Sequence, residues 1–365
     1  MSKHNAANER IKREYFGYLK AARGRDETTI DRVAASLASF EDSTRHKGFD
    51  RFHRAQAVAF KDALSARVNA RTGKPLSKAT ILSTLGDLRA FFVWLMREPG
   101  FKSRIAYSDA DYFNLSDNEV AIARAQREKQ VPTIAQAEHV LAAMPTTTPL
   151  QRRDRALIAF AAVTGARVDA LASFRLEHVD TAAGYVDQDA RDVRTKFRKT
   201  FRTHFMPFVP GAEAIFGEWI DELKRDHLWG PADPLFPSTA MGLGADGGFT
   251  ATGLSRGGWA STGPIRDIFR KAFEGAGLPY FNPHSFRDML IRYGMTLNLT
   301  PEAMKALSQN LGHEGVLTTF TSYGHVPTHR QGTLIRGLGA EREDGGRPDA
   351  IASLEALLAS LKAAA

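Results

Sequence analysis

The sequence predicts a mainly α-helical protein with a small β-sheet, divided into two domains. Its 365 residues are enough for two ordinary domains with a sizeable core. Apolar residues recur at helical spacing through the first hundred residues and again after residue 210. Between these regions, residues 184–209 are rich in Val, Thr, Phe and basic side chains, a composition that indicates two or three short strands.

The first domain is expected to be all-helical. Four stretches carry an apolar stripe along one helix face, and Ser77 is placed to cap the last of them: Arg10–Ala22, Thr29–Phe40, Arg54–Asn69 and Lys78–Arg97. Pro99-Gly100 then ends this last helix. The pattern predicts a compact module of four or five helices.

The second domain is expected to mix helices with the short strands. Thr133 and Thr300 are placed as helix caps. Helices are predicted over Ile134–Met144, Asp154–Val163, Val168–Phe174, Ala212–Arg225, Ile265–Ala276, His284–Leu297 and Pro301–Asn310. The Gly-, Ser- and Thr-rich segment 242–263 is predicted to be a mobile loop.

Changes in composition set the domain boundaries. The helical domain is predicted over residues 1–123, a charged linker over 124–132 and the second domain over 133–336. Residues 337–365 form a tail with an amphipathic helix over Ala350–Ala363, which is too short to be stable unless it packs on something.

Charge and composition narrow the class of protein. The net charge is +8, and residues 1–130 hold 24 Lys and Arg against 16 Asp and Glu, so the excess lies in this first segment. This distribution favours a polyanionic partner gripped by the first domain. The chain has no cysteine, which excludes disulfides and thiol catalysis. A signal peptide and a membrane-length apolar run are both missing, so we expect a cytoplasmic protein without membrane contact.

Four segments of the second domain stand out in order along the chain. They are Thr164–Leu171 (TGARVDAL), the strand-rich stretch Val193–Pro207, Pro283–Arg287 (PHSFR), and the run from Leu311 to Val326. This last run contains LGHE, then Thr318-Thr319, then Tyr323-Gly324-His325-Val326. Together they resemble the TGxRxxEL box, the lysine-bearing β-hairpin, the HxxR box and the LGH…TT…YxHV ending of the tyrosine recombinase (phage integrase) family.

The resemblance implies a role for each of six residues. Arg167 and Arg287 would bind the scissile phosphate with His313, His284 would act as base, Lys199 would be the acid, and Tyr323 would be the nucleophile. Lys199 is preferred because Pro207 follows it by eight positions, and Lys196 at eleven is the alternative. Asp288 stands where family members often carry histidine, a departure that is not expected to affect this set.

The family resemblance also implies the fold and the partners. It implies an all-helical core-binding (SAM-like) domain, to which Ser77–Leu95 is similar, and a mixed α+β catalytic domain that needs no metal or other cofactor. The partners would be double-stranded DNA with inverted-repeat-type sites and further copies of the chain, forming a tetramer on DNA. The helix over Ala350–Ala363 would dock on a neighbouring copy, or alternatively on its own domain.

Two other functions share these features. A type IB topoisomerase uses similar Arg, Lys, His and Tyr chemistry to relax DNA, although His284 and the helical first domain favour a recombinase. A DNA-binding regulator with an inactive site is the other alternative, which the complete set of six residues disfavours.

Overall fold

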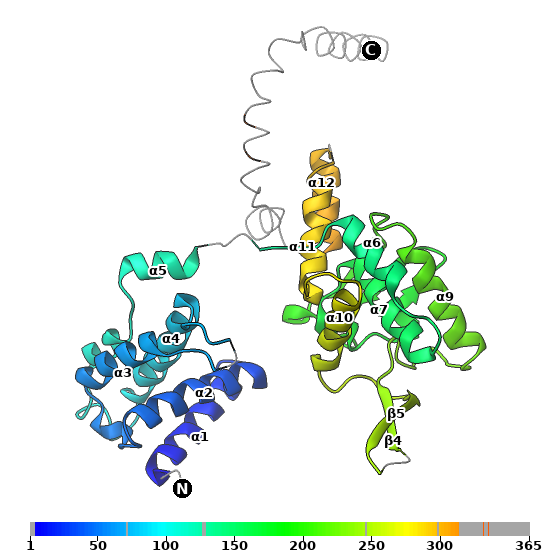
Figure 1. Ribbon diagram of the computed structural model, residues 1–365. Helices are drawn as coiled ribbons and strands as arrows, with labels where there is room; N and C mark the ends of the chain where they lie inside the picture. Colours follow the sequence, from blue (N-terminus) through cyan, green and yellow to red (C-terminus); the bar gives the residue numbers. More distant parts are fainter. Residues whose placement is uncertain are drawn as a thin grey trace, which may run out of the picture. The chain divides into compact units, whose positions relative to one another are not determined.

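The computed structural model describes residues 4–70, 72–125, 129–244, 247–297 and 299–313, together with Gln331 and Ile335 (Figure 1). The chain divides into two compact units, residues 1–127 and 128–365. Each unit has a hydrophobic core of its own. Tyr323 and the tail beyond residue 336 lie outside the described residues.

The first unit is all-helical in its described part, as the sequence predicts. Short 3-10 helices at Phe49–Arg51 and Tyr107–Tyr112 join the main ones. The α-helices are α1 (Ala6–Ala21), α2 (Glu27–Ser43), α3 (Arg54–Ala66), α4 (Lys78–Leu95) and α5 (Asp117–Arg124).

Aromatic rings fill the centre of this unit. Phe92 of α4 is fully buried and stacks on Phe52, with ring centroids 3.8 Å apart. Phe40 of α2 meets Phe92 edge to face at 5.5 Å, and Phe113 stacks on Phe92 at 5.5 Å. Buried aromatic pairs of this kind contribute energy beyond the area they bury. They fix how α2 and α4 pack.

The second unit is built around one buried helix, α7 (Pro149–Thr164). Every residue from Ala156 to Thr164 is buried, and α6 (Ile134–Ala143), α9 (Ala212–Arg225) and α11 (Pro283–Gly294) pack against it. The sequence predicts this helix from residue 154, but it begins five residues earlier. Thr148 caps it, Gln151 completes the capping box, and Pro149 occupies the first turn.

A three-stranded antiparallel sheet lies in the same unit, in the order β1 (Val179–Asp180), β2 (Tyr185–Gln188), β3 (Phe201–His204). In the β2–β3 pair, Gln188 lies opposite Phe201 and Tyr185 lies opposite His204. The connection from residue 189 to residue 200 therefore extends from the Gln188–Phe201 end of the pair.

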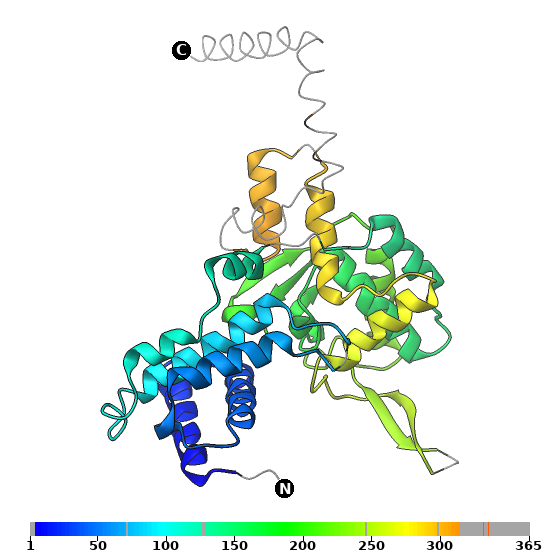
Figure 2. The same cartoon turned by 60° about the vertical axis from the view of Figure 1, so that its left-hand side comes forward.

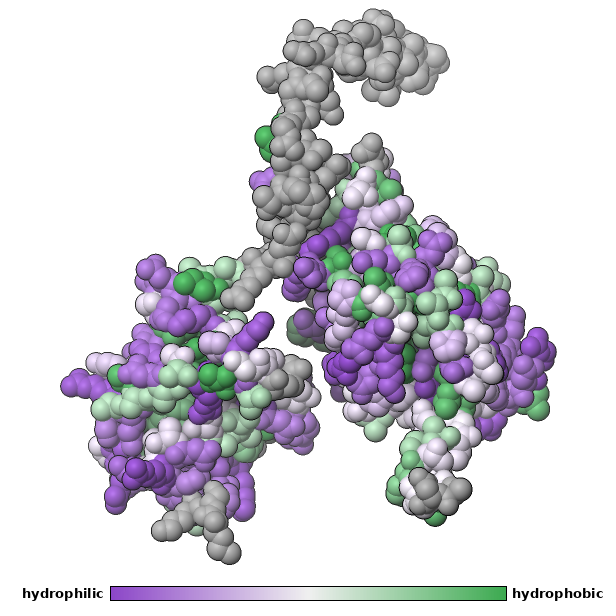
Figure 3. Space-filling model, in the orientation of Figure 1, coloured by the Kyte–Doolittle hydropathy of each residue, from purple (hydrophilic) through white to green (hydrophobic). Residues whose placement is uncertain are grey.

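The segment 242–263 corrects the sequence-based prediction. Instead of a loop, its first half forms a hairpin of β4 (Thr239–Leu243) and β5 (Phe249–Leu254), which projects from the second unit (Figures 1 and 2). Neither face of this hairpin is buried, so its sequence lacks the alternation of apolar and polar residues that a half-buried strand shows. Leu243 and Phe249 lie opposite each other and are exposed, and Figure 3 shows this hairpin in pale and green shades.

Three helices complete the described part of this unit: α10 (Gly263–Gly275), α11 and α12 (Pro301–Asn310). Asn282 caps α11 and Thr300 caps α12. Helices α11 and α12 lie side by side (Figures 1 and 2). None of the helices in the described ranges is long and apolar enough to span a bilayer.

Candidate active site

Arg167 follows a turn that glycine makes possible. Helix α7 ends at Gly165, whose φ of +59° lies in the left-handed region. A Cβ at this position would lie 2.9 Å from Leu311 Cδ2, so the close packing also requires glycine. Arg167 is half-buried at the start of the short helix α8 (Val168–Leu171). Among the described residues, its guanidinium has no hydrogen bond or ion pair.

Arg287 lies in α11 and joins three parts of the site. Its side chain is 2% exposed, and Nη1 donates to the Gly165 carbonyl at 3.1 Å. Nη2 donates to the Leu311 carbonyl at the end of α12 and to Nε2 of His313 at 2.9 Å. One guanidinium thus ties the turn before Arg167 to the end of α12.

His313 is buried at the turn that follows α12. Its backbone N–H donates to the Ser308 carbonyl at 3.1 Å, and its Nε2 accepts from Arg287. Since Nε2 is the acceptor, a neutral ring carries its proton on Nδ1. Gly312, with φ of +66°, makes the turn, and a Cβ there would lie 2.6 Å from the Phe201 ring. The turn therefore packs directly against strand β3.

The connection between β2 and β3 supplies the lysines. It includes a 3-10 turn, Lys196–Arg198, and Lys199 lies just before β3. The ammonium groups of Lys196 and Lys199 lie 4.8 and 5.8 Å from the centroid of the Phe197 ring.

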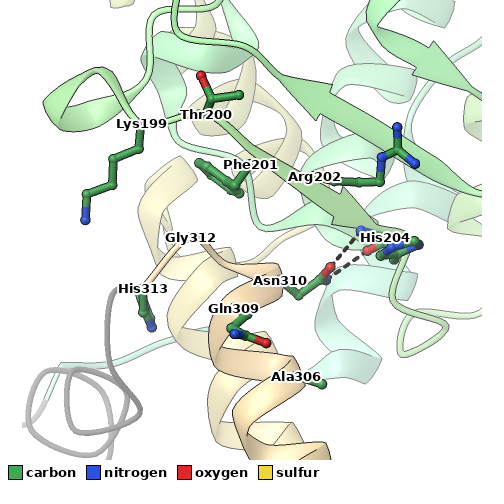
Figure 4. Close-up of a pocket in the computed structure, with 10 residues that line it drawn as sticks. All are labelled: Lys199, Thr200, Phe201, Arg202, His204, Ala306, Gln309, Asn310, Gly312 and His313. Atoms are coloured by element: carbon green, nitrogen blue, oxygen red, sulfur yellow. Dashed lines mark hydrogen bonds between the residues drawn. The ribbon is translucent and has the colours of Figure 1, made fainter.

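Lys199 and His313 line one pocket of about 650 Å³. Figure 4 shows both side chains on the same side of it, Lys199 from the hairpin and His313 from the turn after α12. On the other side, the Asn310 side chain accepts from His204 N at 2.6 Å and donates to His204 O at 2.9 Å. These paired bonds hold the end of α12 against β3.

His284 occupies the first turn of α11, one turn before Arg287. Its side chain is 46% exposed, and its Nε2 lies 3.9 Å from Oδ1 of buried Asp288. Burial raises the pKa of Asp288, partly offset by the nearby cations Lys129 and Arg292. Asp288 thus lies within ion-pair distance of a candidate catalytic residue, a contact that the sequence analysis does not anticipate.

Burial and neighbouring cations act together on both histidines. Burial, with Arg287, Lys129, Arg167 and Lys196, lowers the pKa of His284 to about 4. Burial, with Arg287, Arg167 and Lys199, likewise lowers the pKa of His313 to about 4. Both imidazoles are therefore neutral near pH 7.

The structure brings five of the six residues singled out from the sequence into one site. Arg167 and Arg287 lower the pKa of both histidines. Lys199 lowers the pKa of His313, and Lys196 lowers that of His284. The choice between the two lysines therefore stays open on geometry. The sixth residue, Tyr323, lies outside the described residues.

Sequence reasoning missed the residues that support this site. Asn310 and Thr203 were not singled out, although Thr203 Oγ1 donates to the Asn310 carbonyl at 2.8 Å and accepts from Gln188 Nε2 at 2.8 Å. These partners are far apart in the chain, so no local pattern marks them. The LGH motif was the available signal, since Asn310 immediately precedes it.

The comparisons with known proteins point to one family. The phage integrase family matches over residues 128–330, more than half of the chain. A tyrosine recombinase XerC of Oceanobacillus iheyensis is 27% identical over 320 residues, covering 86% of this chain and 90% of the relative. The XerC of Halalkalibacterium halodurans is 24% identical over 328 residues, covering 87% and 93%.

Two solved structures share the fold. A lambda integrase dimer bound to a COC′ core site matches with a TM-score of 0.58 at 15% identity, covering 87% of this chain and 97% of the other. The XerH site-specific recombinase bound to palindromic difH substrate, in a post-cleavage complex, gives 0.58 at 15% identity, covering 89% and 84%. The chain therefore belongs to the phage integrase family and is a tyrosine site-specific recombinase.

Proposed function

We propose that this chain cleaves and rejoins DNA strands at specific sites through a 3′-phosphotyrosyl intermediate. The observation that carries the proposal is the gathering of two arginines, two neutral histidines and a hairpin lysine in one site. Phosphoryl transfer depends mainly on positioning and on stabilising negative charge, and this set of side chains supplies both.

The arginines would bind the phosphate to be cleaved. The guanidinium of Arg167 is available to a ligand, and it suits the two non-bridging oxygens because its donors form a planar fork. Arg287 would add positive charge to the same phosphate while holding His313 and the turn at Gly165. His313 would donate a hydrogen bond through Nδ1, since its Nε2 is the acceptor for Arg287.

Proton transfers would complete the reaction. The Tyr323 oxygen would attack phosphorus, and its proton would pass to His284, which is neutral and able to accept it. The 5′ oxygen would leave with a proton from Lys199. The phosphotyrosyl bond preserves the free energy of the broken bond, so the 5′ hydroxyl of a second strand can reverse the step without ATP.

The partners belong to the same proposal. The substrate would be double-stranded DNA with inverted-repeat-type sites, gripped partly by the basic first domain over residues 1–123. Residues 124–132 would link it to a catalytic domain over 133–336. Four copies would act together on paired sites, with the helix over Ala350–Ala363 docking on a neighbour. Two proteins of the same fold support this proposal, because a lambda integrase dimer is bound to a COC′ core site and XerH is bound to a palindromic difH substrate.

A modified leaving group tests the role of the lysine. In DNA with sulfur in place of the bridging 5′ oxygen, the leaving group needs no proton. We expect Lys199→Ala to lose about 10²–10⁴-fold in cleavage of normal DNA and to recover on the sulfur substrate. Lys196→Ala is the matched control, with little loss on either DNA. The reverse pattern would assign the acid to Lys196.

A plasmid with two target sites separates recombination from relaxation. A recombinase gives deletion or inversion products that depend on both sites. A type IB topoisomerase would relax a plasmid that lacks the sites, and an inactive regulator would do neither. Relaxation without site dependence would contradict the proposal.

A further inference from the structure

Phe197 is an exposed aromatic side chain that the proposed chemistry does not use. It lies in the β2–β3 connection and is 77% exposed, although burying a phenylalanine ring is favourable. Lys199 follows it by two positions. The ring is therefore exposed close to a candidate catalytic lysine.

The backbone holds the ring outward. Phe197 and Arg198 have φ of +61° and +50°, both in the left-handed region that residues other than glycine avoid. Backbone strain of this kind persists where the surrounding structure imposes it, and it gathers at functional sites. The unusual backbone of this turn thus coincides with the exposed ring.

The base of the connection is firmly anchored. Val193 is buried, and its N–H donates to the Asp189 carbonyl at 2.7 Å. The Arg194 guanidinium donates to the carbonyls of Ala172 and Trp259, each at 3.2 Å. The exposed turn thus follows an anchored base.

The charges around the ring indicate what it contacts. Lys196, Arg198 and Lys199 put three cations within four residues, two of them within 6 Å of the ring centroid. An apolar protein surface would have to desolvate these charges, which is costly. Nucleic acid offers phosphates for the cations and a flat apolar base for the ring.

We propose that Phe197 is a positioning residue that wedges into the DNA minor groove and unstacks the base step beside the cleaved phosphate. The inference rests on the proposed function, because Lys199 sets where the ring falls. Two residues span at most about 7 Å, so the ring reaches a nucleotide next to the departing 5′ oxygen. Apolar wedges of this kind open base steps in other minor-groove proteins.

Unstacking at this step would help both halves of the reaction. Before cleavage it would let the backbone bend so that the phosphate enters the site between Arg167 and His313. After cleavage it would loosen the nucleotide that carries the 5′ hydroxyl, so that this end can move to a partner strand. Loss of the ring should therefore change both the stacking of the base and the rate of DNA cleavage.

The test uses the full chain and a nicked duplex whose sequence comes from covalent capture by the wild type from random duplexes. A 2-aminopurine replaces the base beside the cleaved bond, because its fluorescence rises on unstacking. We expect the rise with the wild type, none with Phe197→Ala and partial recovery with Phe197→Leu. Phe249→Ala, which removes a 79% exposed ring from the other hairpin, is the control and should behave as wild type.

Cleavage rates provide the second readout. Phe197→Ala should cleave the paired duplex about tenfold more slowly, the scale of one lost stacking contact. A mismatch at the same step supplies the unstacking in advance and should restore the rate of Phe197→Ala but not that of Lys199→Ala. The melting temperature of the Phe197→Ala protein should match that of the wild type, because the ring is exposed.

Several results would overturn the inference. Normal fluorescence and rate with Phe197→Ala would show that the ring does not open the step. A slow Phe197→Ala that the mismatch fails to rescue, or one that alters only assembly of the complex, would place its role elsewhere. In all these cases the wild type still forms the covalent product, whereas capture of no DNA by the wild type would instead count against the proposed function.

Discussion

His284 and His313 are kept neutral by burial and by the two arginines proposed to bind the phosphate. Arg167 and Arg287 lower the pKa of both rings, and burial contributes more than either. A histidine charged at pH 7 could not accept a proton from tyrosine. Burial and the charge of the two arginines therefore act together to keep the candidate base neutral.

This electrostatic arrangement predicts the pH dependence of cleavage. An unperturbed histidine with a pKa near 6.5 would leave only about one tenth of the enzyme active at pH 5.5. With the pKa of His284 lowered to about 4, the base stays neutral there, and kcat/KM should be nearly unchanged between pH 7 and 5.5. Single-turnover cleavage at subsaturating DNA measures this directly. A loss centred on pH 6.5 would show that the ring titrates normally in the free enzyme.

At the scale of elements, the site depends on how α12 meets β3. The Asn310 amide pairs with both backbone groups of His204, and Thr203 bonds to the Asn310 carbonyl. Lys199 lies at one end of β3 and His313 just beyond α12. This junction therefore sets the spacing of the candidate acid and a phosphate ligand.

Removing the Asn310 amide should loosen this junction. Asn310→Ala loses two hydrogen bonds, which predicts about 1–3 kcal/mol less unfolding free energy for the second unit. We expect cleavage to fall about tenfold as well, since a displacement of 1 Å can cost up to about 10²-fold. Chemical denaturation and the nicked-duplex assay give the two values. Gln309→Ala, an exposed neighbour on the same pocket, should change neither, and equal effects of both variants would argue against the junction.

The sequence predicts a structural element well when the residues that determine it are neighbours in the chain. Ser77, Thr133 and Thr300 were predicted as helix caps, and each accepts from a backbone N–H three residues on. The β4–β5 hairpin was missed because its strands bury neither face, so its Gly and Thr indicate only a loop. A helix cap can be predicted from neighbouring residues, whereas this hairpin depends on the pairing of its two strands.

The candidate site was predictable as a set of residues and unpredictable as a geometry. Motif spacing singled out His284 and Arg287 on one helix, and the structure has them there. That Arg287 is buried against Gly165 and Leu311 follows from contacts 122 and 24 residues away in the chain. The bonds between Asn310 and His204 span 106 residues, so no local pattern shows them. Asp288 follows His284 by four positions on the same helix, so helix periodicity alone brings these two side chains together.

At the scale of the whole molecule, the candidate site and the basic segment proposed to bind DNA fall in different units. The candidate site residues within the described ranges lie in the second unit, while the excess positive charge lies in the first. Each unit has its own core, and the aromatic cluster around Phe92 belongs entirely to the first. The two units should therefore unfold in separate steps.

A substitution in one core tests this independence. Phe92→Ala removes a fully buried ring and should cost the first unit about 3–5 kcal/mol. Calorimetry should show one unfolding transition moving to lower temperature while the other stays in place. A single transition that shifts as a whole would mean that the units unfold together.

The central claim is that Tyr323 attacks the phosphate, and covalent trapping on a nicked duplex tests it most directly. The nick lies next to the cleavage point, so cleavage releases a short DNA fragment that diffuses away. The phosphotyrosyl product then cannot revert to intact DNA. The wild type and the control Tyr293→Phe should yield a protein–DNA adduct on a denaturing gel, and Tyr323→Phe should yield none. An adduct formed by Tyr323→Phe would contradict the account, because another residue would then be the nucleophile.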